Sequence, residues 1–322
     1  MLGCFICQPR NALHTHEKKT MTPLSGILIA FVLLALSAIA VFMGYMKSMR
    51  RYLAGRWASH ETQPTAQPDS ARQPGVLYVH VPDLRPWGHP NASPYSLKLE
   101  TWLRLNGIAY TVVRGFDLKR APKGKIPWIE LDGIRMGDSE LIIQFLKKRH
   151  ALQSGLSPEQ QAASHAFNRL VSEHTAACMG YARNVQYVEE TLKAYTGLAA
   201  LPLGLRLIAK RIRKGPFAKL QARGLGAHSP AEIYQMGIDD MTAIANHLGN
   251  KPFMNGDATS DVDASVFAML ASIAWVPLPS WPMQKAFFEL PVLQNLQPYL
   301  LRVRDRAWSN GEVPWFTSAP RG

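Results

Sequence analysis

Residues 125–146, KIPWIELDGIRMGDSELIIQFL, limit the possible folds more than any other segment of the chain. The apolar run that starts at Pro127 predicts a buried strand, followed by a tight turn and a second short strand. The amphipathic stretch after them predicts a helix that begins at Asp138 and Ser139. Two strands followed directly by a helix indicate a sheet with helices packed on its faces.

The flanking sequence extends this pattern in both directions. Residues 76–82 (VLYVHVP) and 109–116 (AYTVVRGF) predict strands on either side of an amphipathic helix at 93–107, which Gly107 closes. After Arg149 the strand-like runs end, and helix starts recur as capping patterns at Ser157, Ser229 and Ser260. We therefore expect a β/α domain over residues 76–150 and an all-helical domain over residues 157–310.

The N-terminal part predicts a membrane anchor. After an N-terminal segment at 1–23, residues 24–46 carry no charged side chain, and a membrane-spanning helix needs about 20 apolar residues. A cleaved signal peptide is the alternative, but its apolar region is shorter. The cations at 47, 50, 51 and 56 predict that the globular part is cytoplasmic. The cations at 10, 18 and 19 oppose this orientation unless translation starts at Met21. The polar, proline-rich residues 47–75 predict a linker.

The chain has a formal net charge of +13, which favours anionic partners. Part of this charge lies in a basic stretch around residues 203–223, where cations alternate with apolar residues and no acidic residue occurs. The stretch predicts either contact with anionic lipid or a solvated helix face. No nucleic-acid motif accompanies the charge, so we expect no nucleic-acid partner. The three cysteines predict neither a disulfide scaffold nor a metal site, and we expect Cys178 to be a small core residue.

The predicted architecture resembles the cytosolic glutathione transferase fold, a thioredoxin-like domain followed by an all-helical domain. The segment ASPYSLKLETWLRLNGIAYT resembles the first helix of serine-type transferases, which starts with a Ser-Pro-aromatic motif. The segment GKIPWIELDGIRMGDSELIIQFL resembles the part of that family with a buried cis-proline and an acid-serine pair. With GLGAHSPAEI and DATSDVDASVFAML in the helical half, the chain resembles most the failed axon connections proteins, a branch related to the metaxins.

This resemblance implies glutathione as co-substrate, with no metal, and assigns positions to its binding. Pro127 would be cis, and the main chain of Ile126 would pair with the cysteinyl main chain of glutathione. The carboxylate of Asp138 would meet the ammonium of the γ-glutamyl group, and the hydroxyl of Ser139 would meet its carboxylate at the helix N-terminus. The alternative for Asp138 and Ser139 is an ordinary N-cap.

The resemblance also places the glutathione thiol near Ser93, with Tyr95 as a further pocket residue. Lowering a thiol pKa from about 8.5 to about 6.5 requires about 2.7 kcal/mol. One hydrogen bond to a charged group supplies about 1.5–3 kcal/mol, so one hydroxyl at a helix N-terminus is about enough. Ser93 as a simple helix cap, and Tyr95 as a packing residue, are the alternatives.

Two classes of function therefore remain open from the sequence. The first is a membrane-anchored transferase-like protein that binds glutathione and activates its thiol for addition to an apolar electrophile. The second is a non-catalytic interaction or membrane-organising module of the metaxin kind. The resemblance also implies a homodimer.

Overall fold

The computed structural model describes residues 72–309, except 84–88 and several positions within 197–212 and 277–280. The predicted span at 24–46 lies outside the described residues. Within the described part, no helix is both long enough and apolar enough to cross a membrane. The longest described helix, α9 (Pro230–Leu248), has 19 residues, and it carries the acidic residues Glu232, Asp239 and Asp240. The predicted fold class and the predicted membrane location both included a transmembrane anchor. We correct both predictions by removing that anchor.

A four-stranded mixed sheet forms the first half of the described fold. The strands are β1 (Tyr78–Val81), β2 (Thr111–Arg114), β3 (Trp128–Leu131) and β4 (Ile134–Gly137), in the spatial order β2-β1-β3-β4. β1 is parallel to β2 and antiparallel to β3, which is in turn antiparallel to β4. The strand order along the chain, with a helix between β1 and β2 and another after β4, agrees with the sequence prediction.

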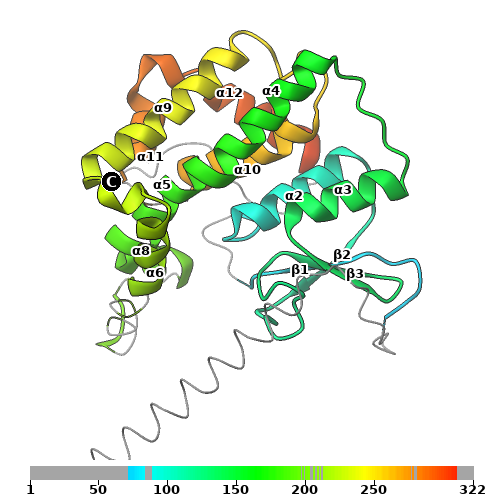
Figure 1. Cartoon of the computed structure of the whole chain (residues 1–322), viewed down its shortest axis with the longest axis horizontal. Coiled ribbons are helices and arrows are strands. Elements are labelled where there is room, and N and C mark those ends of the chain that lie inside the picture. Colours follow the sequence, from blue (N-terminus) through cyan, green and yellow to red (C-terminus); the bar gives the residue numbers. More distant parts are fainter. Residues whose placement is uncertain are drawn as a thin grey trace, which may run out of the picture. The chain divides into compact units, whose positions relative to one another are not determined.

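Helices α2 (Pro94–Leu105) and α3 (Ser139–Arg149) pack on the sheet, between its strands and the helices of the second half (Figure 1). Their apolar sides close a core with the strands. Trp102 of α2, Ile129 of β3 and Ile142 of α3 are fully buried in that core. Burying a large apolar side chain contributes about 1.5–3 kcal/mol, so this layer holds the helix starts at a fixed place on the sheet.

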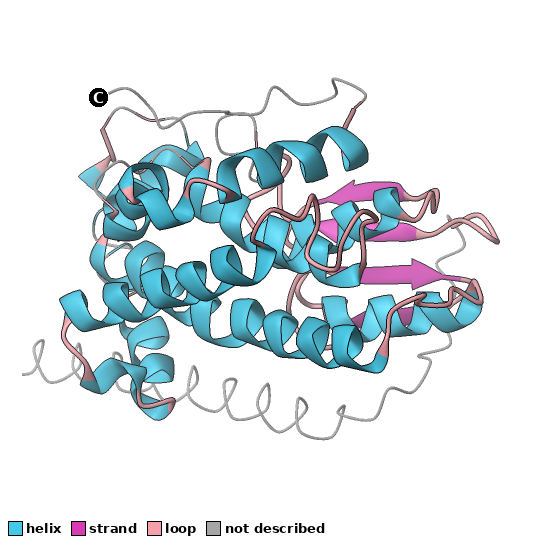
Figure 2. Ribbon diagram, turned by 90° about the horizontal axis from the view of Figure 1, so that it is seen from above, coloured by secondary structure: helices cyan, strands magenta, loops and turns pink. Residues whose placement is uncertain are grey.

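In the second half, the described elements are all helices joined by loops, as the sequence predicted. Its helical segments are α4 (Pro158–Arg169), η1 (Leu170–Thr175), α5 (Ala176–Tyr181), η2 (Ala182–Gln186), α6 (Val188–Thr196), α8 (Lys214–Ala222), η3 (Leu225–Ala227), α9, α10 (Asp261–Ala274), α11 (Pro282–Glu289), η4 (Pro291–Leu293) and α12 (Leu296–Ala307). The capping patterns form at Ser157 and Ser229 as reciprocal boxes, and Asp263 accepts the N–H of Ser260 at 2.8 Å. Figure 2 shows the strands gathered at one side of these helices.

The two halves share a packed boundary, at which α10 lies against α2. Asp261, the first residue of α10, accepts hydrogen bonds from the indole N–H of Trp102 at 2.6 Å and from the ammonium of Lys147. The indole N–H of Trp308 donates to the hydroxyl of Thr101 at 3.1 Å. Because these bonds all reach α2 or α3, the helical half fixes the helices that carry the candidate site.

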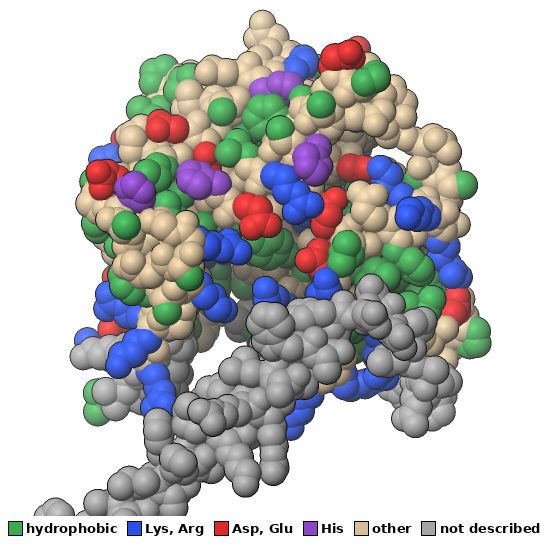
Figure 3. Space-filling view, in the orientation of Figure 1, with side chains coloured by type: hydrophobic (Ala, Val, Ile, Leu, Met, Phe, Trp, Pro, Cys, Tyr) green, Lys and Arg blue, Asp and Glu red, His purple; other side chains and the backbone are tan. Residues whose placement is uncertain are grey.

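The basic stretch lies around α8, in the part of the molecule where Figure 3 shows several Lys and Arg side chains. The cations of the stretch that the structure describes are exposed. Arg206 pairs with Glu189 at 3.5 Å, and Arg223 pairs with Glu173 at 3.6 Å. Exposed cations of this kind fit both a solvated helix face and contact with anionic lipid, so both alternatives from the sequence stay open.

Candidate functional site

The residues singled out from the sequence lie at one edge of the sheet. Ser93 starts the helix that follows the carboxyl end of β1. Trp128 pairs with Gly137 and with His80 in the strand register. The residues just outside these pairs, Pro127 and Asp138, are therefore at the same edge, beside the end of β1. The sheet topology thus brings together three segments that are separate in the sequence.

Ser93 is the N-cap of α2. Its hydroxyl oxygen accepts the backbone N–H of Ser96 at 3.2 Å, and Pro94 occupies the first helical position. This bond uses a lone pair of the oxygen and leaves the hydroxyl proton available. Among the described residues, nothing accepts that proton. The cap role and a donor role toward a ligand are therefore compatible in the same side chain.

A buried polar network holds the loop that precedes Ser93. Asn91 is fully buried; its side-chain oxygen accepts the N–H of Ser93 at 3.1 Å, and its amide donates to Glu100 at 2.7 Å. Arg114 donates to the carbonyl of Pro90 at 3.3 Å. The ring of His89 contacts the carbonyl of Asn91 at 2.6 Å. The loop is therefore positioned by contacts at His89, Pro90 and Asn91 as well as by the helix cap.

Arg183, from η2 of the helical half, completes this network. It is 5% exposed, and its guanidinium donates to the carbonyl of Ala92 at 3.4 Å and to the carbonyl of Ser272 at 2.5 Å. The sequence reasoning missed Arg183, Asn91 and Glu100. Nothing in the linear sequence links Arg183 to Ser93, because the two are 90 positions apart and meet only through the domain contact.

Asp138 is exposed and forms the N-cap of α3, with a positive φ of 85°. One carboxylate oxygen accepts the N–H groups of Glu140 and Leu141, at 3.0 and 3.3 Å. The other oxygen has no hydrogen bond within the described part of the chain. Ser139 is 5% exposed, and its hydroxyl has no hydrogen bond there either. Capping of α3 therefore leaves one carboxylate oxygen of Asp138 and the hydroxyl of Ser139 available to a ligand.

The Ile126–Pro127 peptide bond is cis, as the resemblance implied. Pro127 is buried and Ile126 is partly buried. The main-chain N–H and carbonyl of Ile126 make no hydrogen bond to any residue in the described ranges. They resemble the open edge of a strand, which an extended peptide can extend by pairing.

Tyr95 borders a cavity of about 390 Å³ beside the start of α2. The other walls are small residues of α5 and its neighbour η2, and residues of α8: Ala176, Ala177, Gly180, Asn184, Pro216, Lys219, Leu220, Ala222 and Arg223. The Tyr95 hydroxyl donates to the carbonyl of Ser172 at 2.9 Å. Burial raises the pKa of Tyr95, and the charges of Glu173 and Asp138 add to this effect, so the hydroxyl stays protonated.

Glu140, the residue after Ser139, ties the sheet-edge helices to the helical half. Its carboxylate accepts hydrogen bonds from the ammonium of Lys98 at 2.7 Å and from the amide of Asn168 at 2.8 Å. Burial raises the pKa of Glu140, but the charge and hydrogen bonds around it outweigh burial and bring it to about 2. The carboxylate is therefore ionised and fixes α3 against α2 and α4.

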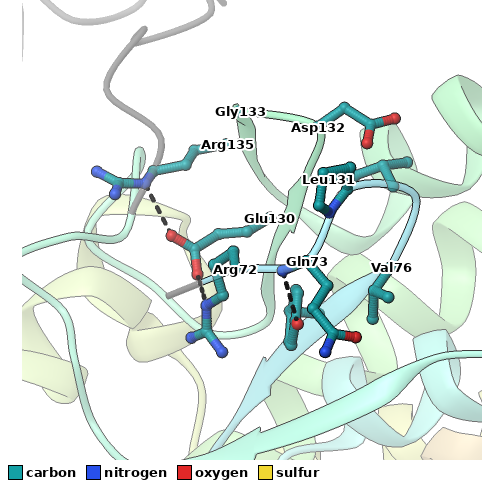
Figure 4. Close-up of a pocket in the computed structure, with 10 residues that line it drawn as sticks. Arg72, Gln73, Val76, Glu130, Leu131, Asp132, Gly133 and Arg135 are labelled. Atoms are coloured by element: carbon teal, nitrogen blue, oxygen red, sulfur yellow. Dashed lines mark hydrogen bonds and ion pairs between the residues drawn. The ribbon is translucent and has the colours of Figure 1, made fainter. Parts of the chain in front are cut away.

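A second cavity, of about 310 Å³, lies away from this edge (Figure 4). It borders the turn of the β3–β4 hairpin at Asp132 and Gly133, the end opposite to Pro127 and Asp138. Beside it, Glu130 accepts hydrogen bonds from Arg72 at 3.1 Å and from Arg135 at 2.9 Å. The carboxylate ties the start of the described chain to the hairpin, which is a structural role. Within the described ranges, no group of three or more His, Cys, Asp or Glu side chains is placed to hold a metal ion.

Two segments of the chain match known domain families. Residues 94–190 match the glutathione S-transferase N-terminal domain, and residues 237–302 match the glutathione S-transferase C-terminal domain. Among solved structures, the beta-etherase LigF from Sphingobium sp. strain SYK-6 aligns with a TM-score of 0.50 at 15% identity, over 71% of this chain and 95% of that one. This last likeness shows the fold alone.

Three relatives each align with about 70% of this chain. Failed axon connections of Drosophila melanogaster is 34% identical over 233 residues, 68% of this chain and 55% of that protein, so the chain spans about half of that relative's length. Metaxin-1 of Sus scrofa is 28% identical, over 71% of this chain and 75% of its own length. The isoprene-epoxide–glutathione S-transferase of Rhodococcus sp. strain AD45 is 31% identical over 243 residues, 71% of this chain and 97% of that enzyme. The chain belongs to the glutathione S-transferase superfamily, in the branch that contains failed axon connections and the metaxins.

Proposed function

We propose that the chain binds glutathione at the sheet edge formed by Ser93, Ile126, Pro127, Asp138 and Ser139. One observation carries the proposal: each of three segments at this edge presents a polar group without a partner among the described residues. These are the hydroxyl proton of Ser93, the main chain of Ile126, and the second oxygen of Asp138 with the hydroxyl of Ser139. A peptide with a thiol, an amide main chain and a zwitterionic end matches these groups in kind.

The proposed chemistry is thiol activation. The Ser93 hydroxyl donates its proton to the sulfur, and the N-terminus of α2 favours negative charge beside it. Both effects stabilise the thiolate relative to the thiol, which is the reactive form for attack on an electrophile. That the Rhodococcus relative is named an isoprene-epoxide–glutathione S-transferase, and is covered almost completely, supports this reading.

The cavity beside Tyr95 is the proposed site for the electrophile. Its walls are mostly small and apolar, and it starts two residues after Ser93, so an apolar acceptor there would lie near the sulfur. The raised pKa of Tyr95 keeps its hydroxyl neutral, so it adds no negative charge beside the thiolate.

Calorimetric titration of the whole chain with glutathione tests the proposal, with Asp138→Asn as the decisive variant. Asparagine keeps a capping oxygen and tolerates a positive φ, but it lacks the charge that meets the ammonium. We expect affinity to fall about tenfold, equivalent to about 1.4 kcal/mol. Asp257→Asn, at another exposed aspartate, is the control and should bind normally.

An unchanged affinity in Asp138→Asn would remove the γ-glutamyl assignment. Failure of the unaltered protein to bind at millimolar glutathione would instead favour a second candidate function, a non-catalytic interaction module of the metaxin kind. What supports that candidate is that Ser93 and Asp138 each cap a helix, which gives both residues a structural duty without any ligand. A homodimer, which the family resemblance implies, is proposed with either function, and light scattering at several concentrations tests it.

A further inference from the structure

Arg183 is a buried cation without a buried anion. Its side chain is 5% exposed, and its two hydrogen bonds within the described part go to carbonyl oxygens, of Ala92 and of Ser272. Its Nε atom has no hydrogen-bond partner among the described residues. No carboxylate of the described residues forms an ion pair with it. Burying a charge without a counter-ion lowers the stability of the fold. We therefore expect such a charge to be retained where it acts on a ligand or on a neighbouring site.

The aromatic residues around Arg183 hold it in place. The guanidinium lies 5.3 Å from the ring centre of Trp281 and 5.8 Å from that of Tyr195. Such contacts partly compensate the buried charge but do not neutralise it. The cation is therefore fixed, dehydrated and able to act on charges nearby through a medium of low dielectric constant.

The Arg183 guanidinium lies close to the position proposed for the glutathione sulfur. It is 3.4 Å from the carbonyl oxygen of Ala92, the residue before Ser93. A carbonyl oxygen lies about 2.8 Å from the next Cα in a trans peptide, so the guanidinium nitrogen is within about 6 Å of the Ser93 Cα. An anion held by the Ser93 hydroxyl would therefore be within about 12 Å of this charge.

We propose that Arg183 is a positioning residue whose buried charge stabilises the thiolate of glutathione bound at Ser93, through the loop carbonyl of Ala92 that it holds. This inference rests on the proposed glutathione site and names a second source of thiol activation. Arg183 does not touch the sulfur. It acts by its field and by fixing the residue before Ser93.

Several other charged or titratable groups lie near this position. On the loop side, burial brings the pKa of His89 down to about 4, so the ring is neutral at physiological pH. On the helical side, burial raises the pKa of Tyr195, which is also neutral. At the cavity mouth, Glu173 and Arg223 pair with each other and largely cancel. Glu100 and Arg114 also contact the loop, through Asn91 and the carbonyl of Pro90, and the charge of Arg114 acts on Glu100. With Asp138 and the neutral Tyr95 beside them, Arg183 is the buried cation that contacts Ala92, the residue before Ser93.

The variants Arg183→Gln and Arg183→Lys separate the effect of the positive charge from the effect of the hydrogen bond to the loop. Glutamine keeps a donor for the loop carbonyl but removes the charge, whereas lysine keeps the charge. The thiol pKa of bound glutathione is followed by the ultraviolet absorbance of the thiolate. At an effective dielectric constant of about 20 and a distance of about 12 Å, one charge shifts a pKa by about one unit. We expect the bound thiol pKa to rise by about one unit in Arg183→Gln and to stay near the unaltered value in Arg183→Lys.

Two controls isolate the effect. Lys285→Gln removes a positive charge from an exposed position of α11 and should leave the thiol pKa unchanged. S-methylglutathione has no ionisable thiol, so its affinity should be the same for the unaltered protein and Arg183→Gln. A parallel loss of S-methylglutathione affinity in Arg183→Gln would show a merely structural role and overturn the proposal.

A third variant keeps the proposal testable if Arg183→Gln does not fold. In Ser93→Ala the hydroxyl is gone but Arg183 remains, so the bound thiol pKa should stay below the value of about 8.5 for a free thiol. A bound thiol in Ser93→Ala that titrates like free glutathione overturns the inference. Normal binding with no pKa change in Arg183→Gln overturns it as well, without touching the proposed function. Absence of any glutathione binding by the unaltered protein overturns both together.

Discussion

Glu100 accepts a hydrogen bond from the side-chain amide of Asn91 at 2.7 Å, and the oxygen of the same amide accepts the N–H of Ser93. The buried carboxyl group of Glu100, in α2, is therefore linked to Ser93 through one intervening side chain, that of Asn91. Burial raises the pKa of Glu100 to about 7, although the charges of Arg114 and Arg104 lower it. The network beneath Ser93 therefore contains a group that titrates near physiological pH.

This gives a pH prediction with a definite sign. The folded protein binds the Glu100 proton more tightly than the unfolded chain does, so this group destabilises the fold as pH rises from about 4.5 through about 7. We expect Glu100→Gln, which stays neutral, to gain stability relative to the unaltered protein between pH 5 and pH 8, by up to about 3 kcal/mol. Urea unfolding at several pH values measures the difference.

Glu289→Gln is the matched control for Glu100→Gln, because Glu289 is exposed at the end of α11. Its stability difference from the unaltered protein should not vary over the same pH range. A flat difference for Glu100→Gln would mean that Glu100 is ionised in the fold throughout, against its burial.

The Lys98–Glu140 ion pair should be a strong structural contact. Lys98 is 4% exposed, and its ammonium lies 2.7 Å from the Glu140 carboxylate and 2.9 Å from the Asn168 side chain. Removing one partner of a buried pair costs about 3 kcal/mol or more, because the other charge is left uncompensated. We expect Lys98→Met to lose about that much in chemical unfolding, and Lys98→Met/Glu140→Gln to recover part of it.

The exposed pair Lys285–Glu289, at 3.8 Å, provides the control, and Lys285→Met should have little effect. The pair also has a pH signature. The pKa of Glu140 is below its ordinary value, so its stabilisation is present above about pH 4.5 and is lost as pH falls toward 2. This acid dependence should shrink in Lys98→Met. A double variant no more stable than Lys98→Met would contradict the proposed cost of the uncompensated Glu140 charge.

Comparing Ser93 with Ser229 distinguishes a capping role from a catalytic role, because each is a serine N-cap followed by proline. Each Ser→Ala change should cost about 1 kcal/mol of stability. Only Ser93→Ala should also raise the thiol pKa of bound glutathione and reduce conjugation of an electrophile. If conjugation exists and is equal in both variants, Ser93 is only a cap.

Gly180 offers a test of the acceptor cavity. A Cβ added there would meet only the Asn184 amide, at 3.9 Å, so a larger side chain can enter the cavity. Gly180→Leu should raise the KM for an apolar electrophile while glutathione affinity stays unchanged, since the cavity is filled but the sheet edge is not. Gly180→Ala adds one carbon and serves as the control. Steady-state kinetics with the electrophile varied distinguishes the two, and an unaltered KM in Gly180→Leu would place the acceptor elsewhere.

Local patterns were sufficient for most of the elements. Hydrophobic periodicity located the strands and α2, and capping residues located the starts of α4 and α9, because these depend on contacts within a few residues. The buried position of Cys178 also followed from its helical pattern. The transmembrane prediction was the error. It rested on the apolar run at 24–46, outside the described residues, and no described helix supports it.

The sequence by itself determined the order of strands and helices and the residues at their starts: Ser93, Pro127, Asp138 and Ser139. Only the tertiary structure decided that these starts share one edge of a sheet, because the pairing of β1 with β3 joins segments about 50 residues apart. The tertiary structure also decided that Glu100 and Arg183 contact the residues next to Ser93, Glu100 through Asn91 and Arg183 through Ala92. Both are buried polar groups, and where such groups find partners depends on how helices from distant parts of the chain pack, which no local pattern records.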